Sequence, residues 1–524
     1  MKAIERLSVI RHLSNKNKDW KHTELFQVLG KDDIWIAAYK NLKENKDVLT
    51  QESTFETLDT NSLLNLSKLR KQVIKQSYQF KSIKEINKLK PDDLQIQLVI
   101  ENDNIVLEVI RMILEAIYEP CFSNKSFGFR QGFGTHDALE HIEFKFRWVD
   151  WIIEKDLQST YSIIDNKLLC NILSKKILDV RFMNLIRKYL KNKIFKQRQK
   201  TYPNHNHFVP QTNIISSIFT NIYYHELDQW FEQKAETLNL KRVNQHNQIH
   251  KQFIDQINQL ANKMQSLDKK SEEYKQLLTT IKTLRREQDQ KQNLAKKYIQ
   301  IEYVRYADDW MIGVKGDFIL ANQLKLEVSK FIHVNLKQTS QPIKTKITGL
   351  RGGKVSFLGY EIYLPKNQMT KTCIRSGIQL MRLANPKLRF DIPLNFILKK
   401  MEKRGYIQNL QKSYRPISKV SYTPLEDVFI VKHFTAVWIE LSNYYSGCTN
   451  LSKLQYLHYL IHSSCAMTLG HRHRKSMKAI FVKHGKKLNI SGSKMTTSFP
   501  YRTNWSLTDR KWFNQKIFID PFTI

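Results

Sequence analysis

Two adjacent carboxylates, Asp308 and Asp309, are the residues of this chain best placed to do chemistry. They follow a strand-like run over residues 303–306 and precede a second apolar run over residues 310–314. This pattern predicts a β-hairpin with both acids at its turn. Carboxylates on a rigid turn can bind Mg²⁺, and two such ions can clamp the attacking and leaving oxygens of a phosphoryl transfer. A solvated turn would be the simpler explanation if nothing else in the chain matched.

The chain is strongly basic. Its 524 residues contain 85 Lys and Arg against 49 Asp and Glu, which gives a net charge of +36 and a pI of about 9.8. So large an excess favours a polyanionic partner, and nucleic acid is the expected one. A basic surface that only maintains solubility is the alternative.

Two classes of protein are excluded by composition. No run approaches the 18 apolar residues of a membrane span, so we expect no membrane partner. The five cysteines form no Cys-x-x-Cys pair, so we expect neither a disulfide framework nor a Cys-rich zinc site. The chain is therefore predicted to be intracellular and reduced.

Hydrophobic periodicity divides the chain into four parts. Residues 1–90 are predicted to be helical, and helical and strand-like runs alternate over residues 91–365. Within this second part, the polar segment 240–299 predicts two antiparallel helices inserted before the hairpin. Residues 375–490 turn helical again, and residues 491–524 are typical of a C-terminal tail.

Several motifs occur in an order and spacing that a chance match would not produce. On these motifs the chain resembles the group II intron maturase/reverse transcriptase family from about residue 30 to about residue 490. The matching segments are residues 126–139 (the family's fingers motif), 221–228 (its palm helix), 357–360 (the strand after the hairpin), and 443–445 and 463–469 (the maturase-specific X domain, or thumb).

The resemblance implies an α+β fold, a right-hand reverse-transcriptase fold of fingers and palm followed by an α-helical thumb, or maturase X domain. Residues 1–90 would extend the fingers. It implies binding to the group II intron RNA that encodes the protein and promotion of its splicing. RNA-directed DNA polymerase activity in intron mobility is also implied. The catalytic metal ligands would be Asp156, Asp308 and Asp309, holding two Mg²⁺ ions, with Asp156 at the end of a strand predicted from residue 151.

The nucleotide pocket departs from the family pattern. By carry-over it would include Tyr161, Gln211, Thr212 and Asn213, but Thr212 and Asn213 stand where the family has two glycines. Glycine lets backbone approach a ligand closely without steric cost. An arginine expected near Leu94 is also missing. A non-catalytic RNA-binding splicing factor with a degenerate pocket is therefore the alternative to a polymerase, and a polymerase with little splicing role is a third reading.

Basic residues in three places are predicted to contact RNA, and a solvated basic face is the alternative explanation for them. Target DNA as a further partner and a homodimer are left open. We expect no cleavage of target DNA, since no endonuclease module with paired Cys-x-x-Cys motifs follows the X domain. An intron product encoded in the mitochondrion is the first expectation, with the plastid second. The predicted RNA contacts are Arg130, Arg187, Lys188, Lys191, Lys193, Arg472, Arg474 and Lys475.

Overall fold

The computed structural model has a mixed α and β structure whose residues group into two compact units. Unit 1 consists of Met1–Arg130 and Lys155–Lys346, and unit 2 consists of Gln131–Glu154 and Ile347–Ile524. The structure describes residues 2–44, 60–80, 84–86, 96–98, 101–155, 164–191, 214–265, 276–277, 279–284, 287, 300–337, 345–365, 370–375, 378–383, 387–411, 413–491 and 496–500. Among these residues, no helix has the length and apolar character needed to cross a membrane.

Unit 1 is mainly helical because its apolar residues recur at helix spacing. α5, for example, buries Ile110, Ile113 and Leu114 completely and packs against α1 and α3. The helices of this unit are α1 (Ala3–Lys16), α2 (Leu25–Leu29), α3 (Asp32–Glu44), α4 (Thr60–Ile74), α5 (Glu101–Tyr118), the short 3₁₀ helix η2 (Glu119–Cys121), α7 (Asn166–Lys176), α8 (Val180–Lys191), α9 (Ser216–Gln265) and α11 (Phe318–Val334).

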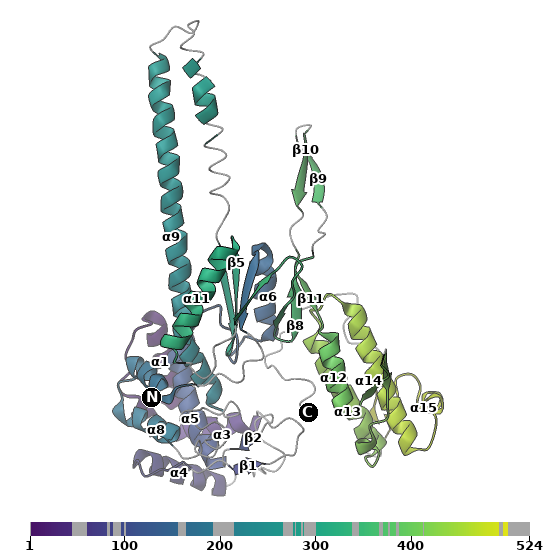
Figure 1. Ribbon diagram of the computed structural model, residues 1–524. Coiled ribbons are helices and arrows are strands. Elements are labelled where there is room, and N and C mark those ends of the chain that lie inside the picture. Colours follow the sequence, from purple (N-terminus) through teal and green to yellow (C-terminus); the bar gives the residue numbers. More distant parts are fainter. Residues whose placement is uncertain are drawn as a thin grey trace. The chain divides into compact units, whose positions relative to one another are not determined.

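α9 is longer than the sequence predicted. It runs without interruption from Ser216 to Gln265, so the expected boundary at residue 240 falls inside one helix. Figure 1 shows α9 extending beyond the other helices of unit 1. Residues 279–284 are also helical, and Ile281 among them is buried. Most of the remaining predicted insertion lies outside the described residues.

The predicted β-hairpin is confirmed. β4 (Gln300–Tyr306) and β5 (Asp309–Lys315) pair antiparallel, with Tyr306 opposite Asp309 at the turn. All five residues from Trp310 to Val314 are buried, which explains why the sequence there is a continuous apolar run. A second, small antiparallel pair in unit 1 joins β1 (Lys84–Ile86) to β2 (Ile96–Leu98).

Unit 2 combines small antiparallel sheets with a helical C-terminal region. α13 packs against α14, and α14 packs against α15. Its elements are α6 (Thr135–Lys145), η3 (Phe146–Trp148), β7 (Val355–Phe357), β8 (Tyr360–Tyr363), β9 (Thr370–Arg375), β10 (Ile378–Leu383), β11 (Arg389–Asp391), α12 (Leu394–Lys403), β12 (Ile407–Asn409), β13 (Tyr414–Pro416), η6 (Val420–Tyr422), α13 (Asp427–Tyr444), α14 (Leu451–Arg472), α15 (Met477–His484), β14 (Ile490–Ser491) and β15 (Thr496–Thr497).

The division into units differs from the four predicted parts. Residues 131–154 group with the C-terminal half, although the sequence placed them with the fingers and palm. The buried ring of His136 lies 2.8 Å, Nε2 to oxygen, from the backbone carbonyl of Tyr444. The backbone N–H of Ser356 donates to a carboxylate oxygen of Glu154. β3 (Trp151–Lys155) and β6 (Thr345–Gly349) each contain a boundary between the units.

The predicted tail begins as packed structure. β14 and β15 pair antiparallel, and the side chain of Phe499 is completely buried. The backbone N–H of Phe499 donates to the carbonyl of Lys487 at 2.8 Å. Residues 491–500 therefore include part of unit 2, and residues 501–524 lie outside the described part of the chain.

Candidate functional site

The acidic turn depends on two unusual backbone features. Ala307 has φ of +56°, a left-handed conformation that non-glycine residues seldom adopt outside tight turns. Gly128 lies directly against it, since a Cβ atom at Gly128 would be only 2.2 Å from the backbone nitrogen of Ala307. The segment around Gly128 and the turn can approach this closely only because residue 128 has no side chain.

A buried charge network holds the turn. Arg305 and Asp228 are fully buried and form a two-pronged ion pair, Nε to Oδ1 at 2.8 Å and a terminal nitrogen to Oδ2 at 2.7 Å. The hydroxyl of Tyr303 donates to the same carboxylate at 2.9 Å. The other terminal nitrogen of Arg305 donates to the carbonyl of Ala307 at 2.6 Å and to the side chain of Asn221 at 3.0 Å. Two residues of α9 thus fix the strand that leads into the turn.

The same network reaches the segment that contains Gly128. The amide nitrogen of Asn221 donates to the carbonyl of Gly128 at 2.8 Å. The backbone of Arg305 exchanges hydrogen bonds with the carbonyl of Lys125 and the N–H of Phe127, both at 2.9 Å. Three separate parts of the sequence therefore meet at one turn within unit 1.

Lys155 supplies a cation to the acidic pair. Its Nζ lies 2.9 Å from Oδ2 of Asp308 and 3.3 Å from the backbone oxygen of the same residue. Burial alone would lower the pKa of Lys155, but neighbouring groups, Asp308 first among them, raise it on balance. Burial, together with the nearby Asp308 carboxylate, raises the pKa of Asp309 to about 6, and the ammonium of Lys155 opposes this shift.

The donor chemistry at the turn fits Mg²⁺ only in part. Asp308 and Asp309 offer the hard carboxylate oxygens that this ion prefers. No group of three or more His, Cys, Asp or Glu side chains able to hold a metal occurs among the residues the structure describes. The predicted third ligand, Asp156, lies outside those residues, directly after Lys155. The three-carboxylate site therefore stays a prediction, supported by the position of Lys155 next to Asp308.

The predicted nucleotide pocket cannot be placed. Tyr161, Gln211, Thr212 and Asn213 all lie outside the described residues, and so does Lys193 among the predicted RNA contacts.

Arg130 is a structural residue in this protein. Its side chain is 5% exposed, and its Nε lies 2.9 Å from a carboxylate oxygen of Glu119. Its terminal nitrogen donates to the backbone carbonyls of Ser123 and Ser126, each at 2.6 Å. This placement corrects the prediction that Arg130 contacts RNA, because its donors already serve the segment that leads to Gly128. The sequence showed the charge of Arg130 but not its burial.

The basic residues of α8 lie on the outer side of an amphipathic helix. Lys188 and Lys191 are exposed, whereas Arg187 is half-buried and donates to the side chain of Asn184. Lys188 also donates to the backbone carbonyl of Gln76. Tyr189, which lies between these basic residues in the sequence, is buried in the core.

The basic residues of unit 2 lie where α14 ends and α15 begins. Arg474 and Lys475 are exposed in the connecting turn. Arg472 Nε pairs with Asp427 at 2.9 Å, and His473 Nε2 lies 2.7 Å from the other oxygen of that carboxylate. Gly470 shapes the turn, since a Cβ there would lie 2.6 Å from the carbonyl oxygen of Lys475.

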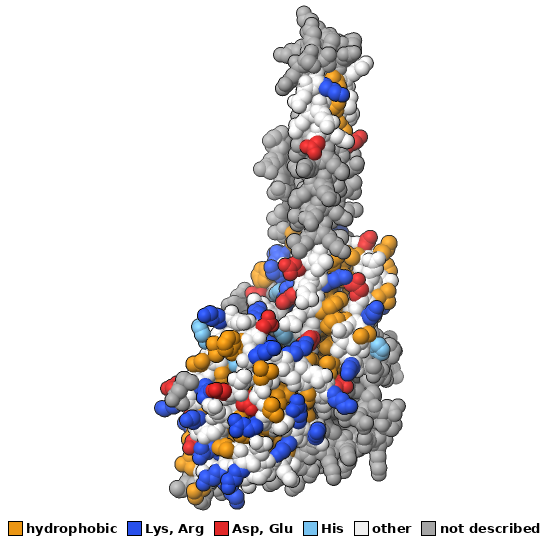
Figure 2. Space-filling view, turned by 90° about the vertical axis from the view of Figure 1, so that its left-hand side faces the viewer, with side chains coloured by type: hydrophobic (Ala, Val, Ile, Leu, Met, Phe, Trp, Pro, Cys, Tyr) orange, Lys and Arg blue, Asp and Glu red, His pale blue; other side chains and the backbone are white. Residues whose placement is uncertain are grey.

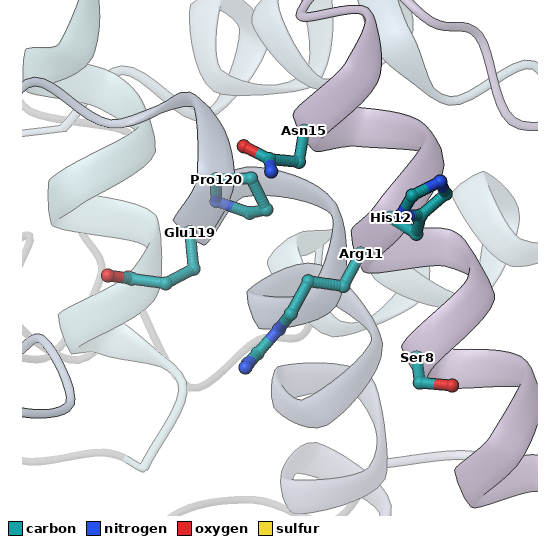
Figure 3. A pocket seen from close by; sticks show the side chains of 6 residues that line it. All are labelled: Ser8, Arg11, His12, Asn15, Glu119 and Pro120. Atoms are coloured by element: carbon teal, nitrogen blue, oxygen red, sulfur yellow. The ribbon is translucent and has the colours of Figure 1, made fainter.

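A pocket of about 420 Å³ lies between α1 and η2, and no residue of the acidic turn lines it (Figure 3). The residues from α1 recur at intervals of three and four, so they share one face of the helix. Sequence analysis did not single out this stripe, although its spacing was the available signal. Burial raises the pKa of Glu119 in its wall, and the guanidinium of Arg130 opposes that shift. The lining residues are Ser8, Arg11, His12, Asn15, Glu119 and Pro120.

Comparison with known proteins identifies the C-terminal region. The type II intron maturase family model matches residues 385–523. The C-terminal part of the chain therefore contains a type II intron maturase domain. The group II intron-encoded protein LtrA of Lactococcus lactis subsp. cremoris is 28% identical over 484 residues, which cover 91% of this chain and 79% of LtrA.

Two further relatives come from eukaryotes. A putative COX1/OXI3 intron 1 protein of Saccharomyces cerevisiae is 27% identical over 505 residues, 94% of this chain and 58% of that protein. Maturase K of Cephalotaxus fortunei is 24% identical over 524 residues, 97% of this chain and 96% of that protein. The similarity to these proteins thus extends well beyond residues 385–523.

The motif over residues 443–445 packs unit 2 together. Tyr444 is buried, and its hydroxyl donates to the carbonyl of Leu358 at 2.5 Å. The hydroxyl of Tyr445 donates to the carbonyl of Gly359 at 3.2 Å. The motif that identifies the family is therefore a packing feature of this unit, and the charged residues available to a partner lie elsewhere.

Proposed function

We propose that this protein is a maturase that binds structured group II intron RNA and promotes its splicing. The observation that carries the proposal is the maturase domain over residues 385–523. That segment contains 23 Lys and Arg against 7 Asp and Glu, so it holds an excess of 16 positive charges. Catalysis of the cleavage and ligation steps belongs to the RNA, and the protein favours the active RNA fold by binding it more tightly than other folds.

The exposed basic residues support RNA binding from both units. Arg474 and Lys475 are free of the ion pair that Asp427 makes with the neighbouring residues, and Lys188 and Lys191 project from α8. Figure 2 shows Lys and Arg side chains spread over one face of the molecule among hydrophobic and acidic ones, and not gathered in one stripe. This distribution suits contacts with the phosphates of a folded RNA, which is recognised mainly by its shape and its unpaired loops.

A substitution at the α14–α15 turn tests the proposal. Lys475→Gln should weaken binding to intron RNA and lower the slope of log affinity against log salt by about 1, as expected for one lost phosphate contact. Lys453→Gln is the matched control, because Lys453 is exposed near the start of α14, about 28 Å along the helix axis from its last residue, Arg472, at 1.5 Å per residue. Filter binding of the full-length protein at several salt concentrations gives both slopes. A wild-type slope near zero would remove nucleic acid as the partner.

RNA-directed DNA polymerase activity on a right-hand reverse-transcriptase fold is the second candidate function, and the buried support of the acidic turn favours it. When bound, Mg²⁺ would stabilise the charge that develops in phosphoryl transfer. Asp308 and Asp309 would hold the ions, together with Asp156. Arg305 and Gly128 would keep the turn in its left-handed conformation, so that both carboxylates stay in position.

The two functions can be separated by substitution of the acids. Asp308→Asn with Asp309→Asn should abolish primer extension on an RNA template and leave intron splicing near the wild-type rate. Truncation after residue 375 should abolish splicing, because it removes the maturase domain. Loss of splicing in a double Asn variant that still folds and binds RNA would contradict this division. Absence of primer extension by the wild-type protein would favour a non-catalytic splicing factor.

The cellular setting follows from the relatives. Intron proteins of Saccharomyces cerevisiae COX1 and a mitochondrial protein of Marchantia polymorpha are among them, and maturase K is another. We therefore infer an organelle-encoded intron product, with the mitochondrion before the plastid.

A further inference from the structure

The side chain of Lys155 is unusually buried for a lysine. Its side chain is only 10% exposed, whereas the side chain of Lys175, which pairs with Glu226 at 2.7 Å in the same unit, is 60% exposed. Lysine is almost never buried this far unless an opposite charge accompanies it. Here the opposite charge is Asp308, one of the two acids at the turn.

The ammonium of Lys155 contacts Asp308 at two oxygens. It lies 2.9 Å from Oδ2 and 3.3 Å from the backbone carbonyl oxygen. Mg²⁺ binds carboxylate oxygens at about 2.0–2.1 Å. An ion that took Oδ2 at that distance would lie close to Nζ, and two cations so near each other in a poorly solvated place repel strongly.

A positive charge close to the turn reduces the repulsion between the carboxylates of Asp308 and Asp309. Asp308 and Asp309 are adjacent in sequence, and the nearest other cation in the network, Arg305, gives its guanidinium to Asp228, Asn221 and the carbonyl of Ala307. Without Lys155, the repulsion between the two carboxylates would have to be balanced by a bound ion or by protonation.

We propose that Lys155 is the built-in counter-ion of the acidic turn and competes with a divalent cation for Asp308. In the metal-free protein its ammonium holds the turn, and metal binding at Asp308 requires the lysine side chain to move away. The chain can then keep its fold and bind intron RNA at low divalent ion concentration. This inference rests on the proposed role of Asp308 and Asp309 as metal ligands.

The test uses Mn²⁺ as the probe and the full-length protein freed of metal with EDTA. Lys155→Met keeps the length of the side chain and removes its charge. We expect the variant to bind Mn²⁺ about tenfold more tightly than the wild type, measured by the electron paramagnetic resonance signal of free Mn²⁺. Its Tm in EDTA should fall, and Mn²⁺ should restore it. Lys175→Met carries the same change in charge and should stay within about twofold of the wild type.

A second substitution assigns the binding site. Asp308→Asn added to Lys155→Met should remove the tighter Mn²⁺ site. If Lys155→Met binds Mn²⁺ no more tightly than the wild type at a site that Asp308→Asn removes, the competition proposed for Lys155 is wrong. If neither protein has a Mn²⁺ site sensitive to Asp308→Asn, the metal role of the turn fails, and the inference fails with it.

Chemical labelling of the wild type avoids any folding defect of the variant. Acetic anhydride labelling followed by mass spectrometry should modify Lys155 more readily with Mn²⁺ present than in EDTA, because the ion displaces the ammonium. Labelling of Lys175 should not change. Equal or lower labelling of Lys155 with Mn²⁺ bound at Asp308 would overturn the proposal.

Discussion

The acidic turn of unit 1 and the basic turn between α14 and α15 of unit 2 use ion pairs in opposite ways. In unit 1, Arg305 and Asp228 are both fully buried, and their donors and acceptors are engaged with neighbouring protein groups. In unit 2, the side chains of Arg472 and Asp427 are 31% and 21% exposed. The comparison indicates that a buried pair fixes the geometry of a site, whereas a partly exposed pair leaves charge within reach of a partner.

A glycine makes a close backbone approach possible in each region. A Cβ at Gly128 would meet the backbone of Ala307 at 2.2 Å, and a Cβ at Gly470 would meet the carbonyl of Lys475 at 2.6 Å. In both regions a glycine therefore permits close backbone packing. Of the two ion pairs, the one in the first region is fully buried and the one in the second is partly exposed.

The largest effect is expected from breaking the buried pair. Arg305→Met leaves the carboxylate of Asp228 buried without its cation, which should lower the free energy of unfolding by about 3–5 kcal/mol. Arg472→Met removes an arginine from the partly exposed pair and should lower it by less than about 1 kcal/mol. Urea denaturation of both variants measures the difference. Equal losses would show that burial does not separate the two regions.

The next effect concerns the glycine beside the turn. Gly128→Ala forces a Cβ against backbone that cannot give way easily, so it should lower the free energy of unfolding by about 2–3 kcal/mol. Gly132→Ala is the control, since a Cβ there meets no atom within 4 Å, although φ is +86° and some strain remains. Thermal unfolding of the two variants should rank Gly128→Ala as the less stable. The reverse order would mean that the turn adjusts around the added methyl group.

A pH-dependent effect is expected at Asp309. Its pKa rises from 3.8 in a free side chain to about 6 in the folded chain, so the unfolded chain loses this proton first as pH increases. The free energy of unfolding should therefore fall between pH 4 and pH 6 through this group. Asp309→Asn removes that loss, so its stability relative to the wild type should rise by about 2–3 kcal/mol between pH 4 and pH 7. Denaturation in EDTA at several pH values would show it, and a difference that does not change with pH would contradict it.

The smallest change in stability is expected at Asp427. Asp427→Asn weakens a partly exposed pair and should change the free energy of unfolding by less than about 1 kcal/mol. It also releases Arg472 and His473 from a carboxylate, so binding to intron RNA should become tighter and more sensitive to salt. Filter binding measures both changes. Weaker binding would indicate that Asp427 orients these side chains for RNA.

Local sequence was enough for the hairpin. Trp310 to Val314 form a continuous apolar run after two acids, and this pattern places a buried strand and its turn without knowledge of the rest of the chain. The family motifs around Tyr444 and Phe357 also depend only on the order of residues.

Charge alone could not show which basic residues are buried, and only the tertiary structure decided this. Arg130 and Lys155 look like other basic residues in the sequence. The fold buries Arg130 against the backbone carbonyl of Ser123 and places Lys155 against Asp308. The supports of the turn, Asp228 and Gly128, lie 80 and 180 residues from Asp308, so no local pattern could connect them. The sequence determined the elements and the chemistry available at each, and long-range packing determined which charges became fixed and which remained free for a partner.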